Sequence, residues 1–329
     1  MLTGASRSVA EPVNEGASQV LAVVVNFNGA GMTARTVETL AAQTKRRALR
    51  VLVIDNGSSA ADVAELERRI AGQADLLGWP RNRGYAAACN AASRIAAESG
   101  IPYVWWLNND LELEPGALEA LLAHLEASPK TAAAGAVTVD LPTGTKVLGA
   151  GMDLSLWRSR VRNRYAGAKV KQLPNRPHGV DVLQGACVLV RIRSLRDIGG
   201  MDEGYFMYGE DVDWSVRARA AGYALDIVPA ARVRHGWAQS SRPDDRLRYI
   251  MRNRVRMMRI HGSPQVQAAF IVYFVFAWLP AYTVGRLIPR FGLDRGLRLA
   301  LSPLIWNMRD AIRRGQWRLN SEDLDIERI

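Results

Sequence analysis

Hydrophobic runs alternate with helix-patterned segments along the first third of the chain. Four apolar runs, rich in β-branched and aromatic residues, stand at Val20–Asn26, Arg50–Asp55, Leu76–Trp79 and Tyr103–Leu107. Runs of this kind are typical of strands buried on both faces, as in parallel sheets covered by helices. Apolar residues at helical spacing fill the segments 33–44, 60–71, 82–98 and 115–127. The alternation predicts an α/β fold, a doubly wound and mostly parallel sheet with helices on both faces.

Polar side chains follow three of these strands at the points where the strands end. They are Asn26, Asn28, Asp55, Asn56, Asn108 and Asp110. In an open α/β sheet the ligand binds beyond the carboxyl ends of the strands, so these residues should converge on one crevice. The sequence has no GxGxxG after the first strand and no GxxxxGK(S/T), which removes the main support for a dinucleotide oxidoreductase or a P-loop enzyme.

The pattern changes after Ala132. A helix is expected from Val212 to about Gly222, and strand-like runs stand at residues 134–139, 180–192 and 224–228. Between the first two runs, the segment Arg158–Arg164 (RSRVRNR) has arginine at every second position. Such a segment forms either the solvated face of a hairpin or a mobile basic loop over a phosphorylated substrate. The sequence leaves both open.

The C-terminal part of the chain is basic and contains one long apolar segment. Residues 242–329 hold 16 Lys and Arg against 8 Asp and Glu, which is most of the net charge of +11. Pro243–Gly262 has an apolar stripe and an arginine stripe at helical spacing, as in helices that lie on anionic lipid. Val266–Gly285 follows without a charge and would span about 30 Å as a helix. We expect a membrane-associating helical region; a helix buried against the α/β domain is the alternative.

The N-terminus and the cysteines indicate the compartment. Residues 1–19 are rich in Ser, Ala, Gly and Glu and lack the apolar stretch of a signal peptide. We therefore expect a disordered lead-in and a cytoplasmic location. Cys89 and Cys187 stand far apart in small, apolar surroundings and are expected to be buried free thiols. The basic surplus indicates an anionic partner, and no nucleic-acid-binding motif accompanies it.

The densest candidate chemistry lies in the segment 208–215, YGEDVDWS. It sets three carboxylates, Glu210, Asp211 and Asp213, between the aromatic residues Tyr208 and Trp214. A solvated acidic loop does not need aromatic neighbours, and a packed core does not favour three acids. We therefore ask which of the three acts as a general base, ionised at neutral pH and within reach of a substrate proton.

Seven motifs occur along the chain in a recognisable order. They are VVVNFNG, VIDNGSS, NRGYAAACN, LNND, QGACVLVR, GGMDEGYFMYGEDVDWSVRARAAGY and His235. From Val20 to Arg254 this set resembles glycosyltransferase family 2, and the order and residues of its motifs are most similar to those of the bacterial rhamnosyltransferase branch. The resemblance implies the GT-A fold and transfer of a sugar from a nucleotide-sugar with inversion. No single motif is specific to the family, and the resemblance rests on the occurrence of all seven in this order.

The resemblance also implies a metal site. Asp110 of LNND matches the last acid of the family's DxD signature and would bind Mg²⁺ or Mn²⁺. Asn108 occupies the first position, a departure also typical of the rhamnosyltransferase branch, and it leaves less negative charge on the metal. His235 matches a histidine that joins the metal site in some members, although a structural role is the alternative.

Further residues are implied to bind the nucleotide-sugar. They are Asn26, Asn28, Asp55, Asn56, Asn82 and Gly84, together with Asn108 and Asp110. Asp55 would contact the pyrimidine or ribose, and it can also stabilise the turn DNGSS. Gly84 would let the backbone approach the nucleotide. Asn82 can instead serve as a helix cap.

In the family the base is the aspartate of an acidic Glu-Asp pair, which is Asp211 here. Glu210 is expected to orient the base or the acceptor. The helix that follows should keep Asp211 ionised through its N-terminal dipole, and the same dipole makes Asp213 a structural acid. Trp214 is expected to wall the acceptor site, with a core position as the alternative. Arg252 would reach a diphosphate, with a membrane-surface role as the alternative.

These inferences divide the chain into a lead-in (1–19), a nucleotide-sugar-binding half (20–110), an acceptor-binding and catalytic half (111–241) and a helical region (242–329). The expected function is transfer of L-rhamnose from dTDP-rhamnose to a polyprenyl-diphosphate-linked or glycan acceptor in cell-envelope polysaccharide assembly, at the cytoplasmic face of the membrane. UDP-galactofuranose, UDP-N-acetylglucosamine and GDP-mannose are alternative donors. A basic membrane- or nucleic-acid-binding module is the non-enzyme alternative, and the oligomeric state stays open.

Overall fold

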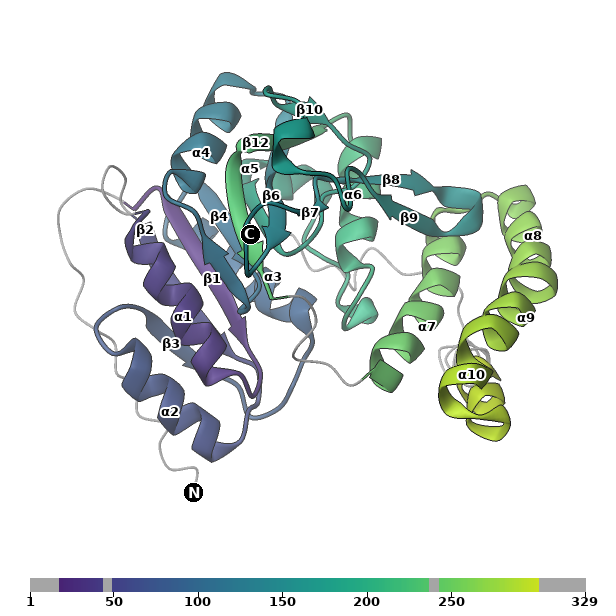
Figure 1. Ribbon diagram of the computed structural model, residues 1–329. Coiled ribbons are helices and arrows are strands. Elements are labelled where there is room, and N and C mark those ends of the chain that lie inside the picture. The colour runs from purple at the N-terminus through teal and green to yellow at the C-terminus, as the bar shows by residue number, and fades with distance from the viewer. Residues whose placement is uncertain (1–17, 44–48, 237–242, 302–329) are drawn as a thin grey trace.

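The computed structural model describes residues 18–43, 49–236 and 243–301 (Figure 1). Most of the expected lead-in and the end of the C-terminal region therefore lie outside the described residues. An α/β body carries a helical extension on one side, and a two-stranded hairpin reaches from the body toward that extension (Figure 1). The hairpin consists of β8 (Met152–Ser155) and β9 (Arg160–Asn163).

The body is built on a ten-stranded sheet. Its strands are β1 (Val20–Asn26), β2 (Leu49–Asp55), β3 (Asp75–Gly78), β4 (Tyr103–Leu107), β5 (Leu111–Leu113), β6 (Thr131–Asp140), β7 (Val147–Gly149), β10 (His178–Gly179), β11 (Cys187–Arg191) and β12 (Ala224–His235). The order is β10-β12-β6-β11-β4-β1-β2-β3, with β5 beside β12 and β7 beside β6. Strands β1 to β4 are parallel, as is the pair β6 and β12, whereas β11 runs antiparallel between β4 and β6.

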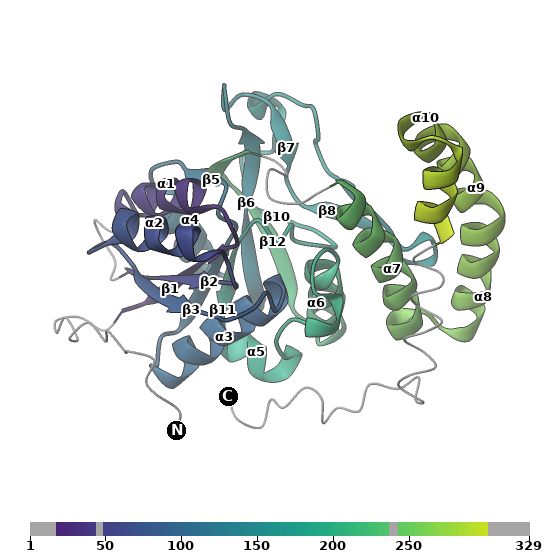
Figure 2. The same cartoon turned by 90° about the horizontal axis from the view of Figure 1, so that it is seen from below.

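Helices cover both faces of the sheet (Figure 2). On one face lie α1 (Ala30–Ala41), α2 (Ala60–Ile70) and α4 (Ala117–Ala127), and on the other α3 (Tyr85–Glu98), α5 (Ile192–Ile198) and α6 (Glu210–Ala220). Successive strand residues point to opposite faces, so Val20 and Ala22 join the core under α1 while Leu21 and Val23 join the core under α3. The predicted doubly wound, mostly parallel sheet is confirmed.

The second half differs from the predicted pattern at three points. Strand β11 begins only at Cys187, because Val182 forms an isolated bridge with Met152 instead of joining the sheet. Strand β12 continues to His235, and a bulge between Val228 and Arg232 accommodates a proline that cannot donate a ladder hydrogen bond. Helix α6 begins at Glu210 rather than Val212, so both acids of the Glu-Asp pair lie in its first turn.

The extension consists of α7 (Pro243–His261) and a long helix, Pro264–Phe291. The long helix contains α8 (Pro264–Val272), α9 (Leu279–Tyr282) and α10 (Ile288–Phe291), joined by π-helical turns at Tyr273–Trp278 and Thr283–Leu287. Each π-helical turn precedes a proline, which cannot donate to the carbonyl one turn back. By length and composition this helix could cross a membrane.

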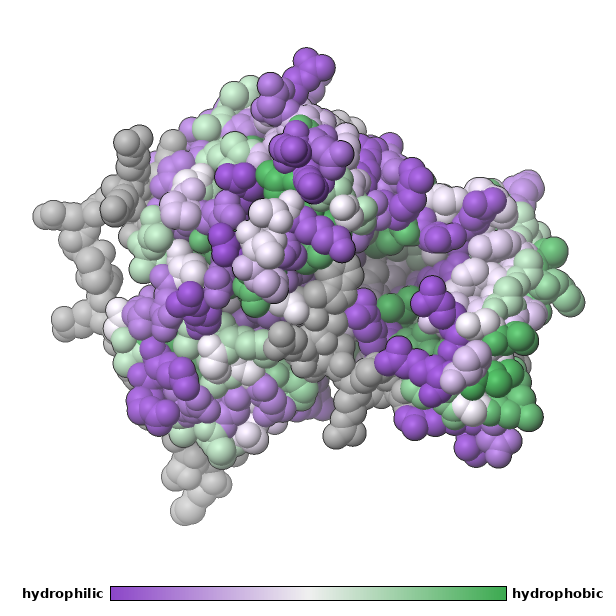
Figure 3. Space-filling view, in the orientation of Figure 1, coloured by the Kyte–Doolittle hydropathy of each residue, from purple (hydrophilic) through white to green (hydrophobic). Residues whose placement is uncertain are grey.

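The long helix packs on α7 with one face only. Phe270 and Phe274 are buried against Met251 and Met258 of α7. The opposite face is apolar and exposed, with Ile271, Val272, Phe276 and Val284 at 57 to 77% exposure. Figure 3 shows the hydrophobic residues of this face along the outer edge of the extension. The helix is therefore not buried in the α/β domain.

Candidate active site

A cavity of about 650 Å³ opens at the carboxyl ends of the central strands. Asn26 of β1 lies beside Asp55 of β2, and Val24 beside Leu107 of β4, so the three strand ends meet at one edge as predicted. The hairpin β8–β9, α6 and α7 form the other walls. Seven of the expected site residues line the cavity: Asn56, Asn82, Asn108, Asp110, Glu210, Asp211 and His235.

Asp110 and His235 form a pair on the cavity wall. The Asp110 Oδ1 atom lies 3.0 Å from the His235 Nε2 atom. The pairing follows from the topology, because β5 comes directly after Asp110 and pairs with the end of β12, where His235 stands opposite Leu111. Both side chains are nearly buried, and Asn108 lines the cavity beside them.

This donor set fits a divalent cation that takes most of its ligands from a substrate. Within the part of the chain that the structure describes, no three His, Cys, Asp or Glu side chains gather to form a metal cluster. One carboxylate, one imidazole and the amide oxygen of Asn108 leave several coordination positions for diphosphate oxygens. Cations that assist the departure of a phosphate group commonly take few ligands from the protein and the others from the phosphate oxygens.

Asp211 is held at the N-terminus of α6 by backbone donors. Its Oδ2 accepts from the Gly185 N–H at 3.0 Å, and its Oδ1 from the Val212 N–H at 2.8 Å. Burial raises the pKa of Asp211, while these backbone hydrogen bonds lower it, and burial is the larger effect. The helix N-terminus therefore orients the carboxylate, and its hydrogen bonds offset part of the effect of burial on the pKa of Asp211.

Glu210 is buried beside Asp211. Its Oε2 atom has no hydrogen-bond partner among the described residues. Burial, and then the neighbouring charge of Asp211, raise the pKa of Glu210 to about 8. A carboxyl group with a pKa of about 8 is mostly protonated near neutral pH, so Glu210 holds a proton there.

Glu210→Gln is expected to stabilise the protein at pH 8. The folded state holds the Glu210 proton up to about pH 8, whereas the unfolded chain releases it near 4.5. The folded state thus binds more protons in this window, so the free energy of unfolding of the wild type falls as the pH rises through it. By thermal unfolding, the variant should exceed the wild type by several degrees at pH 8 and converge with it at pH 4.5. Glu98→Gln, at an exposed position, is the control; a gain that does not change with pH would contradict the assignment.

Asp213 belongs to a buried ion network instead of the cavity. Its Oδ1 lies 2.7 Å from His261 Nε2, and its Oδ2 lies 2.8 Å from Arg217 Nη2. Burial opposes ionisation of Asp213, but the bonds from His261 and Arg217 outweigh it and lower the pKa. The structural role expected of Asp213 agrees with this network, which ties α6 to the end of α7.

The structure shows Asn26, Asn28 and Asp55 engaged with the turn before α2, and their expected contact with the nucleotide stays a prediction. Asn26 is fully buried, and its Nδ2 donates to Asp55 Oδ1 at 2.8 Å. Asp55 also accepts from the backbone N–H of Ser58, the turn role left open above. The side chain of Asn28 accepts from the Ser59 N–H. All three hold strand ends to the turn before α2, and none lines the cavity.

Gly84 has a different neighbour from the one expected. Its φ is +88°, and a Cβ atom there would lie 2.4 Å from the carbonyl oxygen of Phe206. The glycine therefore allows the loop before α6 to approach closely, and the expected approach of the nucleotide stays a prediction. Asn82 lines the cavity, and its Oδ1 accepts from the Gly84 N–H at 2.9 Å. Asn56 donates to the Gly84 carbonyl at 3.2 Å.

Trp214 and Arg252 do not reach the cavity. The Trp214 ring is buried in the core, where it packs edge-on against Trp106 at 5.3 Å and donates to the carbonyl of Gly199. The core alternative for Trp214 therefore holds. Arg252 is buried and donates to the carbonyls of Gly204 and Tyr205. Neither side chain lines the cavity, so the expected contact of Trp214 with the acceptor and of Arg252 with a diphosphate has no support from this geometry.

The sequence analysis missed residues of the extension that complete the site. Asn253 Nδ2 lies within hydrogen-bond distance of the carbonyls of Tyr205, Met207 and Tyr208, at 2.6 to 3.1 Å. It thereby holds a loop in which Phe206 and Tyr208 have φ values of 63° and 66°. Other lining residues that no pattern had singled out are Tyr85, Arg246, Arg254 and Trp278. Arg160 also lines the cavity, and its signal was the basic segment Arg158–Arg164, for which a loop over a phosphorylated substrate was one of two interpretations.

A doubly wound, mostly parallel sheet, together with a cavity lined by a buried acidic pair, a carboxylate and an imidazole, defines a glycosyltransferase of GT-A type. The chain belongs to glycosyltransferase family 2, because the family model "Glycosyl transferase family 2" matches residues 21–199. Family membership decides between an enzyme and a non-enzymatic binding module in favour of the enzyme.

Relatives place the chain near the rhamnosyltransferases of this family. It is 32% identical over 240 residues to the N-acetylglucosaminyl-diphospho-decaprenol L-rhamnosyltransferase of Mycobacterium tuberculosis (strain ATCC 25618 / H37Rv), covering 68% of this chain and 77% of the relative. It is 43% identical over 56 residues to rhamnosyltransferase WbbL of Escherichia coli (strain K12), covering 17% of this chain and 21% of the relative. The chain is thus similar to the rhamnosyltransferase branch, as the motifs suggested.

Solved structures show the same fold. The crystal structure of GalNAc-T7 with UDP, GalNAc and Mn²⁺ aligns with a TM-score of 0.62 at 15% identity, over 90% of this chain and 58% of that one. The mannosyltransferase PcManGT from Pyrobaculum calidifontis, in complex with GDP-Man and Mn²⁺, aligns with a TM-score of 0.54 at 17% identity, over 89% of this chain and 84% of that one. At these identities the likeness concerns the fold alone.

Proposed function

We propose that this glycosyltransferase transfers L-rhamnose from dTDP-rhamnose, with inversion, to a sugar carried on a prenyl diphosphate. The observation that carries the proposal is the 32% identity, over 68% of the chain, to a rhamnosyltransferase named for a diphospho-decaprenol acceptor. The cavity supports it, because Asp211 and the pair Asp110–His235 line one space. In this scheme residues 20–110 supply most of the donor-binding side chains, and residues 111–241 supply the base Asp211 that acts on the acceptor.

The donor end of the cavity would be formed by Asn56, Asn82 and Asn108 together with Asp110 and His235. A divalent cation held by Asp110 and His235 would supply positive charge to stabilise the leaving diphosphate. The two solved structures of this fold contain Mn²⁺, which supports a divalent cation here. The imidazole favours Mn²⁺ over Mg²⁺, because Mg²⁺ is bound mainly by oxygen ligands.

Asp211 would act as the base that takes the proton from the acceptor hydroxyl as that hydroxyl attacks the anomeric carbon. Its two backbone hydrogen bonds fix the carboxylate, and the raised pKa brings it closer to the operating pH, which favours proton transfer. Glu210, protonated at neutral pH, would leave Asp211 as the carrier of the single charge. A single displacement of this kind needs no covalent nucleophile.

The donor is tested by release of nucleoside diphosphate from a panel of nucleotide-sugars. The purified chain is incubated with Mn²⁺ and, separately, dTDP-rhamnose, UDP-galactofuranose, UDP-N-acetylglucosamine or GDP-mannose, without acceptor. The proposal predicts slow hydrolysis and the tightest binding with dTDP-rhamnose. Preference for another donor would overturn the choice of sugar, and absence of hydrolysis and binding with all four would overturn the proposed activity.

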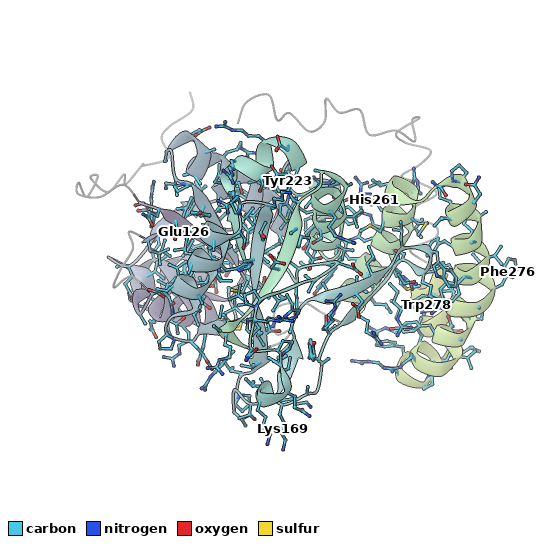
Figure 4. The ribbon with its side chains drawn as sticks, turned by 90° about the horizontal axis from the view of Figure 1, so that it is seen from above. Glu126, Lys169, Tyr223, His261, Phe276 and Trp278 are labelled. Atoms are coloured by element: carbon cyan, nitrogen blue, oxygen red, sulfur yellow. The ribbon has the colours of Figure 1, made fainter. Side chains whose placement is uncertain are left out.

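The extension would bind the cytoplasmic face of a membrane. The helix Pro264–Phe291 exposes Ile271, Phe276 and Val284 on its outer face, and Figure 4 shows Phe276 pointing away from the molecule. An exposed apolar face on a basic region is typical of proteins that lie on anionic lipid. The acceptor of the proposed reaction is itself a lipid, so the same surface would bring the enzyme to its substrate.

Replacing Ile271, Phe276 and Val284 together by Ser is expected to abolish sedimentation with anionic vesicles. The changes remove the exposed apolar area and leave the face that packs on α7 intact. Truncation after Gly262 should also release the protein, but it strips the packed aromatic side chains from α7. Tyr165→Ser removes an exposed aromatic residue elsewhere and is the control. Unchanged sedimentation of the triple variant would refute the membrane role of this face.

A further inference from the structure

Three arginines line the end of the cavity that lies at the hairpin and the extension. Arg160 comes from β9, and Arg246 and Arg254 come from α7. The acids of the cavity come from other elements, namely the end of β4 and the start of α6. Among the residues that the structure describes, none of the three guanidinium groups forms a salt bridge. We call the part of the cavity beside the hairpin and α7 its basic end; Arg246 there also lies 5.6 Å from the centroid of the Tyr208 ring, in the loop before α6.

At the basic end of the cavity, the guanidinium group of Arg254 is held in a fixed position by aromatic rings and backbone carbonyls. Its guanidinium carbon lies 4.0 Å from the centroid of the Trp278 ring and 5.1 Å from that of Phe274. Its Nε donates to the Ser159 carbonyl at 3.0 Å, and its Nη2 donates to the Arg158 carbonyl at 2.7 Å. These contacts fix the group between the hairpin and the long helix.

The charge of Arg254 has no compensating carboxylate. Burial lowers the pKa of Arg254 to about 10, an effect that Tyr273 partly offsets and the charge of Arg160 reinforces, so the group stays positive at neutral pH. A largely buried cation is costly unless an anion completes it. Because Arg160 and Arg246 line the same cavity, an anion with more than one negative charge would complement all three groups.

An apolar wall adjoins the arginines. Leu154, Val161, Ile250, Met257 and Trp278 line the cavity there. Trp278 belongs to the helix whose outer face is exposed and apolar, and Figure 4 shows Trp278 on the side that faces the α/β body while Phe276 points outward. A ligand for this end of the cavity therefore joins a multiply charged anion to a hydrocarbon chain.

We propose that Arg160, Arg246 and Arg254 bind the diphosphate of the acceptor lipid, with the first part of the prenyl chain along the apolar wall. The proposal rests on the proposed function for the identity of the acceptor as a prenyl diphosphate. Planar guanidinium groups match phosphate oxygens in bidentate geometry, which suits a diphosphate better than a neutral sugar. The donor diphosphate belongs at the other end, beside Asp110 and His235.

The test measures binding without turnover. Farnesyl diphosphate, farnesol and dTDP are titrated separately into the full chain in detergent, for the wild type, Arg160→Gln, Arg246→Gln and the double variant. Arg254 stays unchanged, because it also ties α7 to the hairpin. Arg162→Gln is the control, since Arg162 lies on the same strand, pairs with Asp153 and is outside the cavity. Thermal unfolding verifies that each variant is folded.

The double variant should bind farnesyl diphosphate at least tenfold more weakly than the wild type and the control, with binding of farnesol and dTDP unchanged. Equal affinity for farnesyl diphosphate in wild type and double variant, or no binding by the wild type, would overturn the proposal. An equal loss of dTDP binding would assign the arginines to the donor instead. The proposed function is tested separately by the panel of nucleotide-sugars, which contains no lipid, so a failure there can be told apart from a failure of the lipid-binding test.

Discussion

An Asp211→Asn variant is expected to lose transferase activity by about 10²- to 10⁴-fold while it still binds the nucleotide-sugar. The amide has nearly the same shape as the carboxylate but cannot take up a proton. The Gly185 N–H that now donates to Asp211 can still find an oxygen acceptor, so the fold should be preserved. Product formation gives the rate, and titration calorimetry with the donor gives the affinity.

Asp75→Asn is the matched control for this substitution. Asp75 is a half-exposed carboxylate on the edge strand β3, paired with Arg50 and outside the cavity, so its replacement should leave the rate unchanged. If Asp211→Asn kept more than half of the wild-type rate, Asp211 would not be the base. If rate and donor affinity fell together, Asp211 would belong to the donor site.

The largest effect on stability is expected from Asp213→Ala. This change leaves His261 and Arg217 facing a buried position without their carboxylate, and breaking a buried ion pair costs about 3–5 kcal/mol. Urea unfolding monitored by tryptophan fluorescence measures the loss. Because the folded pKa of Asp213 is lowered, its contribution is present above the ordinary value of 3.8 and is lost as the pH falls through the folded pKa.

Two further variants decide whether the ion network is responsible. His261→Ala alone should be milder, and the double variant with Asp213→Ala should lose less than the sum of the single losses, because the two side chains share one interaction. A loss below 1 kcal/mol for Asp213→Ala, or strict additivity in the double variant, would contradict the network.

The first half of the fold could be predicted from the sequence because its signals are local. A strand buried on both faces shows as a continuous apolar run, and β1 and β4 have the predicted bounds. The convergence of strand ends then follows from parallel pairing. The antiparallel insertion of β11 and the bulge in β12 depend on contacts between distant segments, such as Val188 with Gly135, which no local pattern records.

The candidate site was predictable where a motif supplies the residue and the sheet supplies its place, as for Asp110, Asp211 and His235. The direction in which each side chain points could not be predicted from the sequence. On α7 the arginine stripe offered several candidates, and neighbouring positions on a helix point about 100° apart. Arg252 and Asn253 therefore hold the loop before α6, whereas Arg254 faces the cavity.

Direct detection of the product tests the central claim. The purified chain, with Mn²⁺, is given a synthetic N-acetylglucosaminyl-diphospho-prenol and each of the four nucleotide-sugars in turn, and the lipid products are analysed by mass spectrometry. We expect one added rhamnose with dTDP-rhamnose, and product formation slowed by about 10²- to 10⁴-fold when Asp211→Asn replaces the wild type. Addition of another sugar in preference to rhamnose, or full product formation by Asp211→Asn, would contradict it.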